Sequence, residues 1–129
     1  MHLYLNTTER DSFRVALVDK GVVKKDKTIS SARTHSEKLL KTINQLLAQT
    51  KKSVRDIRGI AVVKGPGSFT SLRVGVATAN ALGFALGVPV LGVSKDFKTA
   101  SAVRWPKKKK IQLVIPEYGS EPHITGPKR

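Results

Sequence analysis

The sequence predicts an α/β fold in which helices cover a single mixed sheet. Short apolar segments with period-two alternation occupy the first thirty residues and are typical of strands joined by tight turns. Later apolar residues recur at helical spacing in two segments, with a buried-type strand between them. Strands that come first in succession and then alternate with helices indicate early antiparallel pairs and later parallel ones.

The first three strands are predicted from residues 3–5, 13–17 and 22–29. Residues 13–17, Phe-Arg-Val-Ala-Leu, show the clearest alternation of core-type and exposed-type side chains. Polar residues 7–11 and the Asp-Lys-Gly sequence at 19–21 separate the three segments and favour turns.

A helix is predicted for residues 35–49. Thr34 and Glu37 match the capping-box pattern, in which both side chains bind backbone N–H groups of the first turn. An apolar stripe at helical spacing follows, and its members are Leu39, Leu40, Ile43, Leu46 and Leu47.

Residues 57–63 are β-branched or apolar and predict a buried strand that ends in the glycine-rich segment 64–70. Residues 71–86 then predict a helix with many small residues. Glycine is costly inside a helix, so we expect another backbone to pack closely against it. The small residues are Gly75, Ala77, Ala79, Ala81, Gly83 and Ala85.

The rest of the chain predicts a strand at 88–93, a short helix at 95–103 and a last strand at 111–115. Proline and glycine in residues 116–129 predict an irregular basic tail. We therefore expect one folded lobe, residues 1–115, followed by the tail.

The charge balance is strongly basic. The 129 residues include 24 Lys and Arg against 9 Asp and Glu, which gives a net charge of +15. The excess is spread along the chain, so we expect the folded surface to be positive, with RNA as the commonest partner for such a field. A basic surface that only aids solubility is the alternative.

The composition excludes several classes of protein. Without cysteine there is no disulfide framework, thiol nucleophile or Cys-ligated zinc site. The three histidines lie far apart in sequence, so we expect no metal site. Neither a signal peptide nor an apolar stretch of ~20 residues is evident, which indicates a cytoplasmic protein without membrane contact.

The glycine-rich segment is the one stretch that resembles a chemical site. A helix that begins after glycines offers free N–H groups to an anion, so Gly65, Gly67, Ser68 and Thr70 are candidate anion or nucleotide ligands. The spacing is not that of a P-loop. A plain strand-to-helix turn with Ser/Thr capping is the favoured alternative. Ser68 has no evident His/Asp partners, and we identify no catalytic residue.

Two stretches resemble a known family. The sequence from Lys64-Gly-Pro-Gly-Ser-Phe-Thr-Ser-Leu-Arg to Gly92-Val-Ser94, together with residues 34–40, Thr-His-Ser-Glu-Lys-Leu-Leu, is similar to the TsaB (YeaZ) family of tRNA threonylcarbamoyladenosine biosynthesis proteins. The resemblance implies an actin-like ATPase (ASKHA), ribonuclease-H-like lobe.

The resemblance also implies a function. Such proteins are non-catalytic subunits that bind the catalytic TsaD and, with TsaE, help to form threonylcarbamoyladenosine next to the anticodon of ANN-decoding tRNAs. It implies no cofactor of the chain's own, with ATP or ADP at an interface shared with TsaD and TsaE. Contact with tRNA would come through the complex, and a homodimer in the absence of TsaD stays open.

Three features depart from the family pattern. Asn6 stands where the family often has an aspartate, Ser71 replaces a usual glycine, and the sequence stops at Arg129 without a second lobe. Independent ATP hydrolysis is therefore not expected, and the resemblance is to a short form that keeps the partner-binding lobe.

The resemblance places TsaD on the two helices, 35–49 and 71–86. The expected partner contacts are Leu39, Ile43, Leu46, Val74, Ala77 and Ala81. The run Lys107, Lys108, Lys109 and Lys110 is the densest basic cluster and a candidate tRNA contact, with an acidic face of TsaD or a solvated loop as alternatives.

Two functions of other classes remain open. A small nucleotide-binding ATPase would need an acidic magnesium site, which the sequence does not offer. A free-standing RNA-binding module would explain the charge, but the chain has only seven aromatic residues with which to stack bases.

Overall fold

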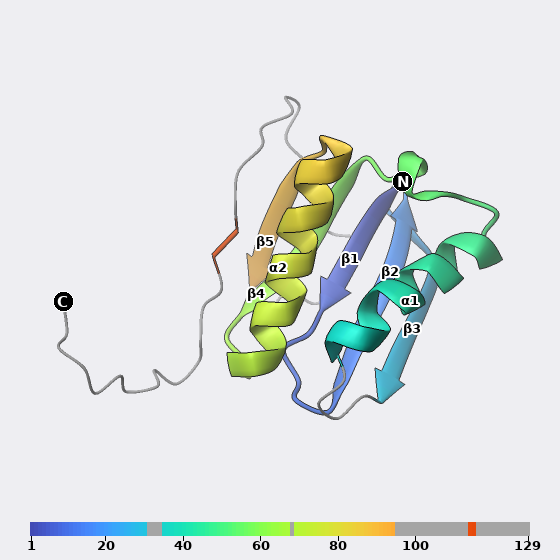
Figure 1. Ribbon diagram of the computed structural model, residues 1–129. Helices are drawn as coiled ribbons and strands as arrows, with labels where there is room; N and C mark the ends of the chain where they lie inside the picture. The colour runs from blue at the N-terminus through green and yellow to red at the C-terminus, as the bar shows by residue number, and fades with distance from the viewer. Residues whose placement is uncertain (31–34, 68, 95–113, 116–129) are drawn as a thin grey trace, which may run out of the picture.

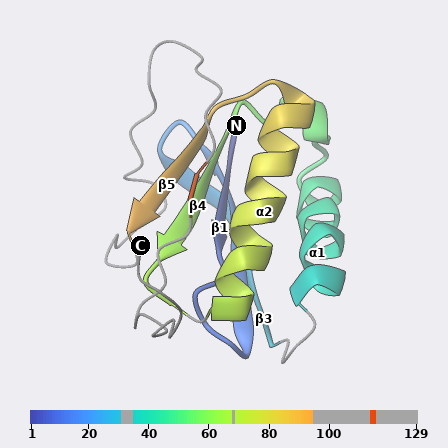
Figure 2. The same cartoon turned by 60° about the vertical axis from the view of Figure 1, so that its left-hand side comes forward.

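The computed structural model describes residues 1–30, 35–67, 69–94 and 114–115, which form one sheet with two helices on one of its faces (Figures 1 and 2). The strand order is β3-β2-β1-β4-β5. In chain order the elements are β1 (His2–Asn6), β2 (Ser12–Asp19), β3 (Val22–Ser30), α1 (His35–Gln49), the 3₁₀ turn η1 (Val54–Asp56), β4 (Gly59–Gly65), α2 (Phe69–Leu86) and β5 (Val90–Ser94).

The pairing of the strands follows the order of the elements along the chain. β2 is antiparallel to both β1 and β3, whereas β4 is parallel to β1 and β5. The predicted mixed sheet, with early antiparallel and later parallel pairs, is confirmed. Parallel pairing brings the carboxyl ends of β1 and β4 to the same edge of the sheet, where α2 begins.

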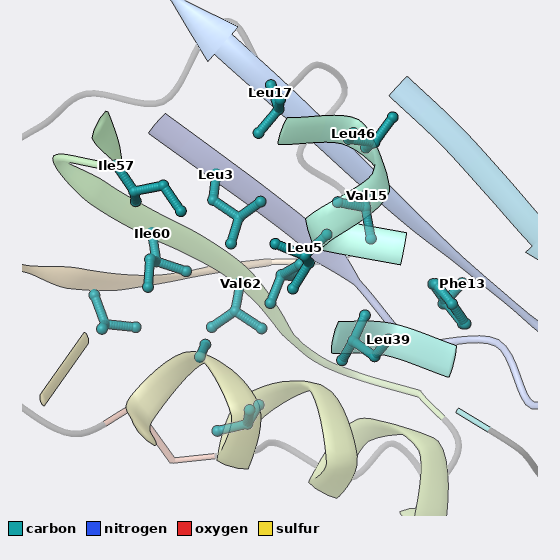
Figure 3. Packing of buried hydrophobic residues seen from close by; sticks show 14 of the residues in the cluster. Leu3, Leu5, Phe13, Val15, Leu17, Leu39, Leu46, Ile57, Ile60 and Val62 are labelled. Carbon is teal, nitrogen blue, oxygen red and sulfur yellow. The ribbon is translucent and has the colours of Figure 1, made fainter. Parts of the chain in front are cut away.

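The main core lies between the sheet and the two helices (Figure 3). Odd-numbered residues of β1 and β2 face this layer because successive strand side chains alternate between faces. The largest fully buried members are Leu3, Leu5, Phe13, Val15, Leu17, Leu39, Ile43, Leu46, Ile60, Val62 and Leu72. A second cluster on the opposite face contains Tyr4, Ala16, Val18, Ala61 and Val63.

Several boundaries differ from the sequence prediction. α2 begins at Phe69 instead of residue 71, and η1 was not predicted. Val114 and Ile115 are described without strand pairing, so the predicted last strand is wrong at these two residues. The side-chain amide of Asn80 instead binds the Val114 backbone, accepting from its N–H and donating to its carbonyl at 2.9 Å each.

Other predicted segments lie outside the described residues. These are the helix at 95–103, the lysine run 107–110, residues 111–113 and the tail at 116–129. Within the described part of the chain, no helix combines the length and the apolar character needed to cross a membrane.

Two glycines let α2 approach the sheet closely. A Cβ at Gly75 would overlap the side chain of Thr7, and a Cβ at Gly83 would overlap Val90. Both glycines are buried. The Thr7 hydroxyl is buried as well and has no hydrogen-bond partner among the described residues. Gly75 and Thr7 therefore set the distance between α2 and the end of β1.

We expect Gly75→Ala to lower the free energy of unfolding by about 2 kcal/mol, because the added methyl group must displace Thr7 from a packed interface. Urea titration followed by circular dichroism measures this loss. Thr7→Ala should restore part of it, because the hydroxyl and methyl that the new Cβ meets are then gone. A Gly75→Ala chain as stable as the wild type would contradict this packing.

His2 makes stability depend on pH. Burial lowers the pKa of His2 below its ordinary 6.5, the N-terminal amine and Arg58 lower it further, and Asp19 opposes them. The unfolded chain therefore binds more protons below pH 6.5 than the folded one, and stability should fall as pH drops from about 7 to 5. His2→Gln should flatten this dependence in urea titrations. An unchanged pH profile in that variant would contradict it.

Candidate functional site

An apolar groove lies between α1 and α2 on the side away from the sheet. It encloses about 430 Å³ and is lined by Leu40, Ala77, Thr78, Ala81, Leu82 and Ala85. Ala77, Ala81 and Ala85 recur every four residues along α2 and form one stripe on the helix. All three are exposed, so this stripe on the outer surface of α2 is apolar and lacks bulk.

The small residues of α2 thus divide between its two faces. Gly75, Ala79 and Gly83 are buried and face the sheet. The alanines at 77, 81 and 85 face outward. The prediction that another backbone packs closely against this helix is confirmed for the sheet side, by the contacts of Gly75 and Gly83. The outward stripe is free to accept a second close neighbour.

The structure corrects half of the predicted partner contacts. Leu39 and Ile43 are 1% exposed and Leu46 is fully buried, because all three point into the core between α1 and the sheet. Their assignment as partner contacts is wrong. Val74 is half-buried against the core cluster, whereas Ala77 and Ala81 are exposed in the groove wall.

Sequence reasoning missed two apolar side chains on the same surface. Leu40 is 49% exposed and Phe84 is 76% exposed. Leu40 was placed in the core stripe of its helix, but residues 39, 43, 46 and 47 complete that stripe without it. Its position about 100° around the helix from Leu39 was the available signal.

The glycine-rich loop has a packing explanation. Gly65 adopts a φ of 127° and precedes a cis peptide bond to Pro66. A Cβ at Gly67 would lie 2.7 Å from the Cβ of Thr8, so only glycine lets the loop rest on the segment after β1. Thr70 is exposed in the first turn of α2, and Ser68 lies outside the described residues. The anion-site prediction for this loop stays a prediction.

Asn6 is engaged in a local turn at the end of β1. Its side-chain oxygen accepts hydrogen bonds from the Thr8 N–H at 3.0 Å and the Thr8 hydroxyl at 2.7 Å. A neutral amide held in this way supplies no anionic ligand. Among the described residues no three His, Asp or Glu side chains gather as a metal site would require.

A smaller pocket of about 260 Å³ lies beside this turn. It is lined by Asn6, Thr8, Glu9, Ser12, Phe13, Arg14 and Thr28. Arg14 forms an ion pair with Asp26 and stands 5.7 Å from the centre of the Tyr4 ring. Burial raises the pKa of Tyr4, although Arg14 and Asn6 oppose the rise, so the phenol stays neutral at physiological pH.

Comparison with known proteins identifies the family. Residues 24–116 match the family described as TsaD, tRNA N6-adenosine threonylcarbamoyltransferase. The chain is 30% identical over 108 residues to the tRNA threonylcarbamoyladenosine biosynthesis protein TsaB of Buchnera aphidicola, covering 84% of this chain and 50% of that protein. The chain belongs to the TsaD family, in its TsaB (YeaZ) branch.

A solved structure agrees with this TsaB-branch assignment. YeaZ from Pseudomonas aeruginosa superposes with a TM-score of 0.65 at 32% identity, covering 71% of this chain and 43% of that one. The described sheet and helices are thus one lobe of the actin-like (ASKHA), ribonuclease-H-like fold, as predicted.

TsaD-type relatives also match. The tRNA N6-adenosine threonylcarbamoyltransferase of Nitrosospira multiformis is 48% identical over 63 residues, which cover 49% of this chain and 18% of that protein. This TsaB-branch chain spans half or less of the length of each of these relatives.

Proposed function

We propose that this chain is a non-catalytic partner subunit of TsaD in the formation of threonylcarbamoyladenosine in tRNA. The observation that carries the proposal is the exposed apolar groove between α1 and α2 on a chain of the TsaB branch. Modification of the adenosine next to the anticodon of ANN-decoding tRNAs would then be the activity of the assembled complex.

The groove has the chemistry of a helix-docking surface. A stripe of Ala77, Ala81 and Ala85 presents no side chain beyond Cβ, so a partner helix can approach closely enough for its side chains to fill the groove. Leu40 and Phe84 flank the stripe and supply larger apolar contacts. Contiguous exposed apolar surface of this kind is typical of protein interaction sites.

The turn at Asn6 supports a non-catalytic role. In an actin-like lobe this turn lies beside the start of the helix that follows β4, where a carboxylate would be needed near magnesium and phosphate. Here the side chain is an amide whose oxygen already accepts two hydrogen bonds from Thr8. The described residues therefore do not fit a magnesium nucleotide held by this chain alone.

The proposal extends to the composition of the complex. TsaE joins the assembly, and ATP or ADP binds at an interface shared with TsaD and TsaE. Contact with tRNA occurs through the complex. Support for these steps comes from the TsaB resemblance of the sequence.

Replacing Ala81 by Arg should abolish binding to TsaD. The long charged side chain fills the groove and would lie buried and unpaired under a docked helix, so we expect at least a 30-fold loss of affinity. Co-purification with the TsaD of the same organism, followed by isothermal titration, measures the loss. Because Ala81 is exposed in the free chain, the variant should keep its circular dichroism spectrum.

Ala48→Arg is the matched control. Ala48 is an exposed helical alanine near the end of α1 and does not line the groove. This variant should bind TsaD as the wild type does. Equal binding by the Ala81→Arg and Ala48→Arg chains would show that TsaD does not use the groove, and failure of the wild type to bind would refute the proposed partnership.

The purified chain should hydrolyse no ATP, because Asn6 replaces the carboxylate that an actin-like ATPase would use. Hydrolysis is measured as phosphate release in the presence of magnesium and ATP. The complex of this chain with TsaD and TsaE serves as the positive control. Hydrolysis by the chain alone that Thr70→Ala abolishes would favour the nucleotide-binding ATPase alternative, because Thr70 is an exposed hydroxyl in the first turn of α2.

A further inference from the structure

Five exposed basic side chains gather at the edge of the sheet opposite the glycine-rich loop. We call this set the basic rim, and its members are Lys20, Lys51, Lys52, Arg55 and Arg58. They come from two connections: Lys20 lies in the β2–β3 turn, and the other four lie in the segment that joins α1 to β4 through η1. Four of the five lie within residues 51–58 of the sequence, and the pairing of the strands adds Lys20.

Contacts of the amino-terminal residues link these two connections. The Arg58 N–H donates to the Met1 carbonyl at 2.7 Å, which holds the start of β4 against the start of β1. The Met1 amine lies 3.9 Å from an Asp19 carboxylate oxygen, next to the β2–β3 turn. Since β1 lies between β2 and β4, the backbones of the strand that Lys20 follows and the strand that Arg58 precedes are about 10 Å apart.

Hydrogen bonds hold the connection after α1. The Lys52 N–H donates to the Leu47 carbonyl at 2.8 Å, and the Thr50 hydroxyl donates to the carbonyls of Leu46 and Leu47 at 3.0 Å. Ser53 and Asp56 then form a capping box around η1. The basic side chains of this connection therefore project from an ordered backbone, which limits the entropy lost on binding.

Lysine occupies both left-handed backbone positions of the rim. Lys20 has a φ of 53° and Lys51 a φ of 58°, and within the described residues they are the two non-glycine positions with positive φ. Glycine fits such positions without strain and takes them at Gly21 and Gly87. Both conformations belong to local turns: Lys20 and Gly21 form the two-residue turn between β2 and β3, and Lys51 lies in the turn that ends α1. Both lysines are exposed on these turns.

We propose that the basic rim binds the phosphate backbone of RNA, and that it is a tRNA-docking surface of this subunit. The inference rests on the proposed function, which makes tRNA the substrate of the complex. Five positive side chains face two carboxylates at this edge, Asp19 and Asp56, and both carboxylates have local partners. Positive side chains therefore outnumber negative ones on this surface.

An RNA backbone fits the rim better than an acidic protein does. Protein interfaces draw their affinity from buried aromatic or apolar anchors surrounded by a polar border. The rim is almost wholly charged, and Val22, 53% exposed, is the large apolar side chain beside it. Phosphate contacts need only cations at suitable spacing, which the rim supplies.

The rim and the groove do not overlap. The groove lies on the helix layer and is lined by residues of α1 and α2, whereas the rim follows the edge of the sheet at the amino ends of β1 and β4 (Figures 1 and 2). The two proposed surfaces therefore share no residue.

The test compares two triple variants of the full chain that lose equal charge. K51Q/K52Q/R55Q removes three cations from the rim. R10Q/K38Q/K41Q removes three exposed cations from the β1–β2 connection and the first half of α1. Fluorescence anisotropy with a labelled tRNA transcript, over a series of salt concentrations, measures affinity and its salt dependence.

We expect the rim variant to bind tRNA at least tenfold more weakly than the control variant. The magnitude of its slope of log affinity against log salt should fall by about 2, because binding with fewer phosphate contacts releases fewer counterions. Equal losses in the two variants would show that the general positive field binds RNA and would overturn the proposal. Absence of tRNA binding by the wild-type chain would overturn it as well.

Co-purification with TsaD keeps this outcome separate from that of the proposed function. The rim variant should bind TsaD normally. If it keeps tRNA affinity and loses TsaD, the rim is a protein interface and the proposal is wrong. If the wild type does not bind TsaD, the proposed partnership fails, while tRNA anisotropy still decides the role of the rim.

Substitutions of Lys51, which has a positive φ, test its role in binding. Lys51→Gly should raise the thermal midpoint by about 4 °C, because glycine adopts the left-handed conformation without a steric penalty. The same change should weaken tRNA binding about threefold through the lost charge. Lys51→Gln should weaken binding equally without the gain in stability. Unchanged tRNA affinity in both variants would contradict a binding role for Lys51.

Discussion

The closeness of α2 to the sheet is the constraint on which the rest of the structure depends. Gly75 lies against Thr7 and Gly83 against Val90, so the helix backbone rests almost directly on the strands. Gly67, two residues before α2 begins, makes the same kind of contact with Thr8. The loop motif, the small residues of α2 and the two threonines after β1 therefore form one packing unit.

The outer face of α2 also carries small residues, although no contact with the sheet requires them there. The two glycines of the helix lie on the sheet side, and the outward positions 77, 81 and 85 are alanines. With Leu40 from α1, these alanines leave a shallow apolar groove in place of a polar surface. A chain with net charge +15 thus presents two surfaces of different chemistry, an apolar groove on the helices and a basic rim along one sheet edge.

Sequence patterns predicted the elements well and the directions of side chains less well. The alternation in β2 and the apolar stripe of α1 depend on local periodicity, and both elements form where that periodicity predicts them. The stripe could not say whether Leu39, Ile43 and Leu46 face the sheet or a partner, and burial in the core decided it. Contacts across space were also hidden. Thr8 explains Gly67, and Lys20 joins the basic residues of 51–58 only when the strands pair.

The central claim, that TsaD docks in the groove between α1 and α2, is tested most directly by amide hydrogen exchange of this chain with and without TsaD. The account predicts slower exchange in peptides that contain Leu40 and residues 77–85, with unchanged exchange in the β3 peptide, residues 22–30. Protection of β3 with unchanged exchange across 77–85 would contradict it.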